Sequence, residues 1–220
     1  MEDAAYRRPV DGATWDATLE IRRSRFLALA ARVTTEEDAR AFIATARSDH
    51  PDARHHCSAF ILHVDGANPV ERSSDDGEPS GTAGQPMLEV LRGSDLQDVA
   101  VVVVRWFGGV KLGTGGLVRA YGDATREVLD GITVVRREQR ALWALSVSHA
   151  DAGRLEADLR NRGMDVEAFY GAEVTLTLTL DPDEDPTGTV AGLTGGAVTV
   201  RRAGEEWCDV PVDTRETRTR

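Results

Sequence analysis

The densest group of residues that could do chemistry follows an apolar run. Val99–Phe107 is nearly all apolar, and the next ten residues hold five glycines, Gly108, Gly109, Gly113, Gly115 and Gly116. Glycine lets a backbone approach a ligand closely, and the free N–H groups of a helix start attract anions. Arg105, Lys111, Thr114 and Arg119 lie in or beside this segment. We predict an anion or partner site here, against the alternative that the glycines only supply a tight turn and close helix–strand packing.

The segment matches neither common phosphate loop. A Walker loop ends in Gly-Lys-Ser/Thr, but Lys111 is followed by Leu112. The dinucleotide fingerprint needs glycine at position 118, which is valine. A nucleotide-hydrolysing or Rossmann enzyme is therefore not predicted.

A second predicted helix start echoes the first. Gly81, Thr82 and Gly84 precede an apolar helical pattern, as Gly113, Thr114 and Gly116 precede Leu117. Two helix N-termini facing one cleft could bind an anion or an acidic side chain. The alternative is two ordinary helix caps made by threonine.

Between these segments lies an acidic run of Ser74, Asp75, Asp76, Gly77 and Glu78. Three carboxylates could hold Mg²⁺ or Ca²⁺, but the run lacks the alternating spacing of an EF-hand loop. We therefore favour a solvated Asp/Gly turn and expect no metal.

The other reactive group is His55-His56-Cys57, at the start of a predicted strand. Alternation places His55 and Cys57 on one face and His56 on the other. A zinc site needs further ligands, and neighbouring strand residues point apart, which disfavours a Cys–His nucleophile pair. We expect packing and hydrogen bonding here, with no catalytic residue and no cofactor.

The elements that position these residues can be read from periodicity. The pattern predicts strands at Ala17–Val33 (two, broken near Ser24), Arg54–Val64 and Val99–Phe107, the last buried on both faces. Helices are expected from a Thr34/Glu37 capping box to His50, over Thr82–Arg92, and from the glycines to Asp130. A further strand is expected at Ile132–Val135.

After Arg140 the pattern restarts, with strands at Ala141–Val147, Val174–Leu180 and Ala197–Arg202. Helices are expected at Asp151–Arg162 and, weakened by Pro186, at Asp183–Leu193. The order is that of a ferredoxin-like split unit. We predict an α+β protein of two α/β sandwich domains, 14–138 and 139–212, with flexible tails at 1–13 and 213–220.

Composition limits the function classes. The chain has 220 residues, a net charge of −11 and two cysteines. Wide wrapping of a polyanion is excluded, although a local basic patch is not. The longest apolar run, Val99–Val104, is too short for a membrane span, the charged Met1–Pro9 has no signal core, and scarce cysteines suit a reducing cytosol. We expect a cytoplasmic protein without membrane contact; its oligomeric state is not predicted.

Four motifs, in order, resemble the YigZ/IMPACT family: Ser24-Arg25-Phe26, Pro51–Cys57, Ser74–Gly84 and Arg105–Leu117. The resemblance implies a first domain with the fold of the second domain of a small-subunit ribosomal protein. It also implies a second, ferredoxin-like domain similar to a late domain of elongation factor G. The eukaryotic IMPACT members are regulators of translation that act through protein partners and carry an additional N-terminal domain, for which this chain has no room before residue 17.

The leading hypothesis is a non-enzymatic accessory or regulatory factor of translation. It would bind a ribosome, RNA or translation-related protein through Arg105, Lys111, Gly113–Gly116 and Arg119, with Ser74–Gly84 as the neighbouring wall. One alternative is an enzyme that holds a small phosphorylated or carboxylated metabolite at the same helix starts, where Asp75, Asp76 or His55 moves protons. The other is a pure protein-interaction module.

Overall fold

The computed structural model describes residues 5–212 and divides into two compact units. The first holds the chain up to Arg136 and again from Asp209, and the second is Arg137–Cys208. The first unit contains β1 (Tyr6–Pro9), β2 (Thr14–Ile21), β3 (Ser24–Arg32), α1 (Glu36–Asp49), β4 (His55–Leu62), β5 (Val70–Ser74), α2 (Gly84–Gly93), β6 (Val99–Trp106) and α3 (Thr114–Asp130). The remaining elements are β7 (Val134–Val147), α4 (His149–Arg160), β8 (Asp165–Tyr170), β9 (Val174–Leu180), α5 (Thr187–Thr194) and β10 (Val200–Pro211).

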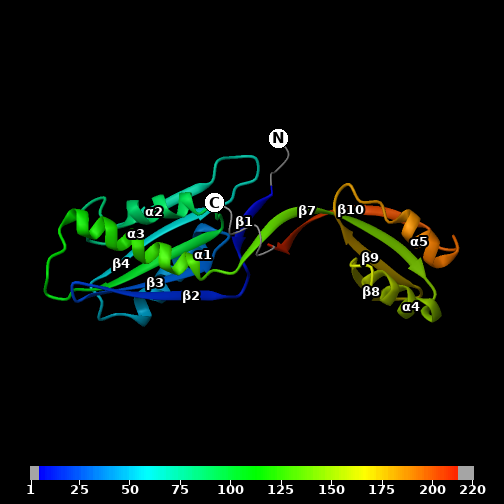
Figure 1. Cartoon of the computed structure of the whole chain (residues 1–220), viewed down its shortest axis with the longest axis horizontal. Helices are drawn as coiled ribbons and strands as arrows, with labels where there is room; N and C mark the ends of the chain where they lie inside the picture. Colours follow the sequence, from blue (N-terminus) through cyan, green and yellow to red (C-terminus); the bar gives the residue numbers. More distant parts are fainter. Residues whose placement is uncertain (1–4, 213–220) are drawn as a thin grey trace. The chain divides into compact units, whose positions relative to one another are not determined.

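The first unit is built on an antiparallel sheet in the order β2-β3-β6-β4-β5 (Figure 1). Its central strand β6 is buried on both faces, as the valine run predicts. Helices α2 and α3 pack on one face, where Met87, Leu91 and Tyr121 meet Val101 and Val103. Helix α1 packs on the other face, against Val102 and Val104. The sheet therefore has a helical layer on each side.

The second unit has the strand order β8-β9-β7-β10, with α4 and α5 between its strands along the chain. Leu176 and Leu178 of β9 enter its core, while the alternating threonines lie on the other face. This is the split βαββαβ arrangement that the sequence predicts, although the range of β8 was not among the predicted strands. Pro186 does not interrupt α5: it precedes the first helical residue, a position where proline is tolerated. The predicted α+β class is confirmed.

The ends of several elements, and the boundary between the two units, differ from the prediction. The capping box is made by Thr35 and Asp38, one residue after the expected pair. The strands expected at Ile132–Val135 and Ala141–Val147 are one continuous strand, β7, so the expected boundary at 138/139 falls inside it. The step between units lies at Arg136/Arg137.

Residues 1–13 were expected to be a flexible tail, but their described part contains a strand. Tyr6–Pro9 forms β1, and Arg8 is buried between Asp98 at 3.0 Å and Asp209 at 2.8 Å. Arg32 also pairs with Asp209, at 2.8 Å. These ion pairs explain why the chain rejoins the first unit at Asp209. The tail expected at 213–220 lies outside the described residues.

Candidate functional site

The acidic loop between β5 and α2 is held against the protein by hydrogen bonds rather than solvated, as the contacts of Asp75 show. Its Oδ1 accepts hydrogen bonds from the backbone N–H of Ala83 (3.0 Å) and Gly84 (2.9 Å), and its Oδ2 accepts one from Gly81 (2.7 Å). Burial acts to raise the pKa of Asp75, but these three donors outweigh it and hold the pKa below its usual value. The N-terminus of α2 is thus occupied by a carboxylate of the same chain.

The threonine cap that was the alternative prediction for α2 is not formed. Ala83 occupies the cap position without a side-chain hydrogen bond, and the Thr82 hydroxyl instead donates to the carbonyl of Pro79 at 2.6 Å. Gly84 is required for another reason: a Cβ there would lie 2.7 Å from the backbone nitrogen of Ser74. An aspartate of the same loop, rather than a threonine, therefore caps this helix start.

Asp76 is also engaged. Its Oδ2 accepts the backbone N–H of His56 at 2.6 Å, and its Oδ1 accepts from Arg47 at 2.8 Å. Burial acts to raise the pKa of Asp76, but Arg47 and the His56 N–H bring it below the usual value. The carboxylates of Asp75 and Asp76 therefore hold the loop in place through hydrogen bonds and an ion pair. Neither is free to transfer a proton from a bound substrate.

Glu78 is buried under α3 with two donors on one oxygen. Its Oε1 accepts from Arg105 Nη1 at 2.5 Å and from the Tyr121 hydroxyl at 2.8 Å. The side chains of Arg105 and Glu78 are only 7% and 4% exposed. Arg105 is therefore not the exposed cation that a surface basic patch requires. Its Nε is buried without a hydrogen-bond partner among the described residues.

The His-His-Cys group follows the alternation predicted from sequence. Cys57 enters the core beneath α2 and α3, whereas His56 points to the opposite face, where its Nε2 lies 3.0 Å from the His50 carbonyl. Burial raises the pKa of Cys57 to about 12, so its thiol is protonated at neutral pH. Among the described residues, no three His, Cys, Asp or Glu side chains gather closely enough to hold a metal ion.

Six of the predicted site residues do meet in one cavity of about 450 Å³, which we call the α3 cleft. These are His55, Glu78, Arg105, Lys111, Gly113 and Thr114, and the remaining lining residues are Arg54, Pro79, Phe107, Leu112 and Leu117. Arg54, Arg105 and Lys111 supply three positive charges against one negative charge at Glu78, a local balance of +2. The cleft is thus cationic in a chain whose net charge is −11.

The start of α3 forms one wall of this cleft. Gly113 stands at its cap position with φ 73°, and no side chain of the described residues caps the helix there. A Cβ at Gly113 would meet nothing within 4 Å, but this left-handed backbone favours glycine. The Leu117 N–H bonds to the Gly113 carbonyl, which leaves the earlier N–H groups of the first turn directed outward. The two predicted helix starts therefore differ: α2 is capped by Asp75 and α3 is open.

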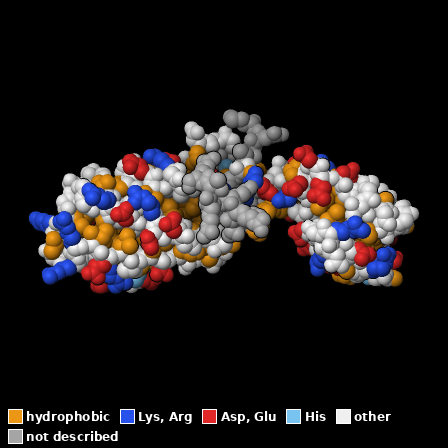
Figure 2. Space-filling model, in the orientation of Figure 1, with side chains coloured by type: hydrophobic (Ala, Val, Ile, Leu, Met, Phe, Trp, Pro, Cys, Tyr) orange, Lys and Arg blue, Asp and Glu red, His pale blue; other side chains and the backbone are white. Residues whose placement is uncertain are grey.

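Gly108 fixes the loop that leads to the cleft. A Cβ there would lie 2.0 Å from the carbonyl carbon of Arg23, so only glycine allows the loop to cross the β2–β3 turn. The Gly108 N–H donates to the Ser24 hydroxyl at 3.2 Å. In Figure 2 several Lys and Arg side chains gather at the left end of the first unit, the end to which the loop between β6 and α3 runs in Figure 1.

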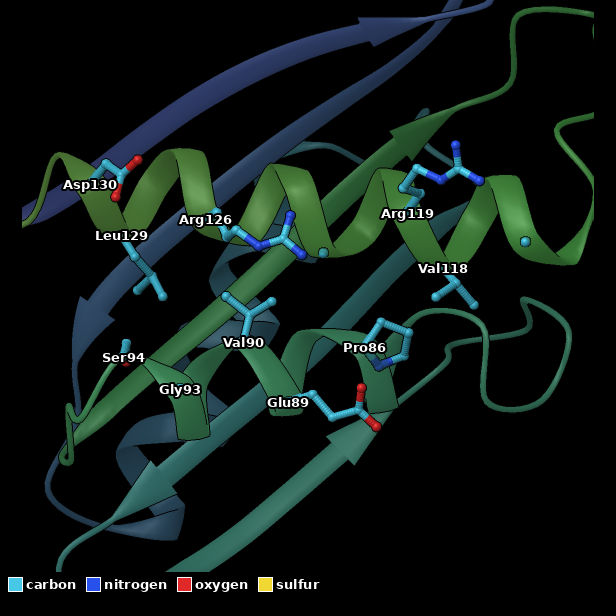
Figure 3. Close-up of a pocket in the computed structure, with 12 residues that line it drawn as sticks. Pro86, Glu89, Val90, Gly93, Ser94, Val118, Arg119, Arg126, Leu129 and Asp130 are labelled. Carbon is cyan, nitrogen blue, oxygen red and sulfur yellow. The ribbon is translucent and has the colours of Figure 1, made fainter. Parts of the chain in front are cut away.

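The other predicted site residues lie elsewhere. Gly115 and Arg119 line a separate groove of about 710 Å³ between α2 and α3, where Arg119 and Arg126 project from α3 and Glu89 from α2 (Figure 3). Gly116 packs against Leu112, which a Cβ would approach to 3.0 Å. Ser74, Asp75, Asp76, Gly77, Gly81, Thr82, Gly84 and His56 belong to the acidic loop and its supports. The single basic cleft expected from the sequence is thus divided into two surfaces.

Arg54 and Phe107 line the α3 cleft but were not among the site residues predicted from the sequence. Arg54 is exposed and directly precedes His55, and Phe107 is 51% exposed and directly follows the buried strand β6. Neither Arg54 nor Lys111 forms an ion pair within the described residues. Phe107 was expected to be the last residue of the buried strand, but β6 ends at Trp106 and leaves Phe107 exposed outside the sheet.

Comparisons with known proteins agree with this architecture. The model of the Impact N-terminal domain matches residues 22–129, which include the α3 cleft and its supporting loop. A Bacillus subtilis protein, IMPACT family member YvyE, is 45% identical over 64% of this chain and 64% of its own length. The Escherichia coli protein IMPACT family member YigZ is 40% identical over 73% of this chain and 79% of its own length.

A solved structure described as that of a hypothetical protein extends the likeness to both units. It is 32% identical, has a TM-score of 0.59 and covers 97% of this chain and 100% of that chain. The matched stretch spans slightly less than two thirds of the Bacillus subtilis relative. None of the helices within residues 5–212 combines the length and apolar character that a membrane span needs.

Proposed function

This chain belongs to the IMPACT family, and from that premise we propose that it is a cytosolic accessory or regulatory factor of translation. It binds a ribosomal, RNA or protein partner through the α3 cleft. The observation that carries the proposal is the convergence of Arg54, Lys111 and the open start of α3 on one cavity. Cations that form no ion pair within residues 5–212, beside free N–H groups, favour an anionic partner, and ribosomal RNA presents a phosphate at every nucleotide.

The charge distribution supports a small contact. A net charge of −11 opposes wide wrapping of RNA, whereas a cleft with a local balance of +2 engages only a few phosphates. Binding should therefore weaken with salt, with a slope smaller than that of a protein that neutralises many phosphates.

Co-sedimentation with purified ribosomes tests this proposal. The wild-type protein, Arg54→Glu/Lys111→Glu and a control are compared at low and moderate salt. Arg105→Glu is unsuitable, because it would bury a second carboxylate against Glu78. The control, Arg40→Glu/Arg154→Glu, changes the charge equally at two exposed positions that do not line the cleft.

We expect salt-sensitive pelleting of the wild type and the control and its loss in the cleft variant. Absence of wild-type pelleting at both salt concentrations would refute ribosome binding. Equal loss in the control would show that total charge, rather than the cleft, attracts the ribosome.

A protein-interaction module is the second candidate, and the α2–α3 groove is the observation that favours it. Val118 is 41% exposed on the groove wall next to Pro86, and Val90 and Leu129 line the same groove further along (Figure 3). Binding at such a surface survives high salt, because apolar contacts are screened little. A partner captured at high salt by the wild type but not by Val118→Asp would favour this candidate.

A further inference from the structure

We propose that the α3 cleft binds one unpaired nucleotide, with its phosphate at the start of α3 and its base against the ring of Phe107. This inference rests on the proposed function and names the chemistry recognised at the same site. A nucleotide joins an anion to a flat aromatic base, and the cleft offers a counterpart to each.

The phosphate end is defined by Arg54, Lys111, Gly113 and Thr114. The capping of helix α2 can be compared with that of α3 in the same protein. There, Asp75 receives three backbone N–H bonds at 2.7 to 3.0 Å. The start of α3 has no side-chain cap among the described residues, yet it has two cations beside it that form no ion pair there. An anion from outside the chain fits this arrangement better than solvent alone.

The base end is defined by Phe107. Phe107 is 51% exposed, whereas Phe26 of strand β3 is fully buried. The Arg105 guanidinium lies 5.8 Å from the Phe107 ring centroid and 5.4 Å from that of Phe26. Because Arg105 is itself fixed by Glu78, the exposed ring rests beside a rigid, buried cation. Bases stack on such aromatic platforms with little sequence preference.

The size of the cleft restricts the ligand to a small unit. About 450 Å³ lies in the lower part of the range of small-molecule pockets, about 300 to 1,000 Å³. Paired bases in an A-form duplex are stacked on one another, so they cannot reach a ring inside a cavity. Loop or single-stranded nucleotides, and free nucleoside monophosphates, present the same phosphate and base. The experiment must therefore distinguish these two sources.

Fluorescence anisotropy with a labelled single-stranded RNA of roughly eight nucleotides provides the test. The competitors are an unlabelled hairpin duplex and free AMP and UMP. The variants are Phe107→Ala, Phe107→Trp and Lys111→Gln. Phe169→Ala is the matched control, because Phe169 is 73% exposed and does not line the cleft. Thermal unfolding of each variant checks that the fold is retained.

We expect Phe107→Ala to weaken single-strand binding by about 5- to 100-fold, and Phe107→Trp and Phe169→Ala to retain it. Lys111→Gln should weaken binding and lower the salt slope by about one. Competition by free AMP and UMP would assign the site to free nucleotides, and competition by RNA alone would assign it to a strand. Both results support the site.

Wild-type affinity in a folded Phe107→Ala protein would overturn the inference, as would absence of binding to both RNA and free nucleotides. The two proposals can fail separately. Ribosome pelleting that Arg54→Glu/Lys111→Glu abolishes but Phe107→Ala leaves intact would retain the translation proposal and discard the nucleotide site. Nucleotide binding without ribosome pelleting would retain the nucleotide site and discard the translation proposal.

Discussion

Arg105 Nη1 lies 2.5 Å from Glu78 Oε1, and this ion pair, almost excluded from solvent, joins the central strand β6 to the acidic loop beneath α3. Tyr121 donates to the same oxygen at 2.8 Å. The pair connects the two motifs that the sequence suggested as opposite walls of a cleft. The acidic loop therefore holds Arg105 in place and does not face it across a cleft.

Glu78→Gln should therefore destabilise the first unit strongly. Removing one partner leaves the Arg105 charge buried without compensation, which costs about 3 to 5 kcal/mol. The matched control is Asp123→Asn, which breaks an exposed ion pair with Arg126 on α3 and should cost under about 1 kcal/mol. Urea denaturation of both variants measures the difference. Equal midpoints would mean that the buried pair contributes no more than the exposed one.

Asp75→Ala should destabilise α2 in a pH-dependent way. Loss of the carboxylate cap costs about 1 to 2 kcal/mol at neutral pH. The pKa of Asp75 is lowered in the folded protein from its usual 3.8, so its contribution is present above that value and is lost as the pH falls through the folded pKa. The stability difference between wild type and variant should therefore shrink below about pH 4. A difference that persists unchanged at lower pH would contradict the cap.

Gly108→Ala should prevent the close crossing of the loop and the β2–β3 turn. The added Cβ would lie 2.0 Å from the Arg23 backbone, and we expect a cost of at least about 2 to 3 kcal/mol. Gly93→Ala, at a helical glycine with nothing within 4 Å, is the control and should be neutral or stabilising by up to about 1 kcal/mol. Thermal unfolding of the two variants compares them. Similar melting temperatures would show that the loop can move away.

Cys57 should resist thiol reagents in the native protein. Its side chain is fully buried and its pKa is raised to about 12, so both access and thiolate are lacking at neutral pH. Mass spectrometry after timed labelling should show modification of Cys57 only once denaturant unfolds the first unit. Rapid labelling without denaturant would reopen the hypothesis of a nucleophilic cysteine.

The sequence by itself determined the buried strand, predicted at Val99–Phe107 and observed at Val99–Trp106, as well as the two flanking helices and the ferredoxin-like second unit. Each of these depends on a periodic apolar pattern that any folded arrangement must bury. Alternation alone also separated Cys57 from His56 correctly. The capping box differed by one residue, because local signals compete at a helix end. The continuous strand β7 was missed because its middle, residues 136–140, is entirely polar or charged and breaks the apolar pattern.

Only the tertiary structure decided what the charged residues do. An aspartate and the helix start it caps are separated by up to nine residues, and Glu78 and Arg105 by 27, so no local pattern reveals their contacts. Whether an arginine faces solvent or a carboxylate depends on the three-dimensional approach of distant segments. In the folded chain, Asp75, Glu78 and Arg105 make structural contacts. Arg54, Lys111 and Phe107 remain the accessible groups of the α3 cleft.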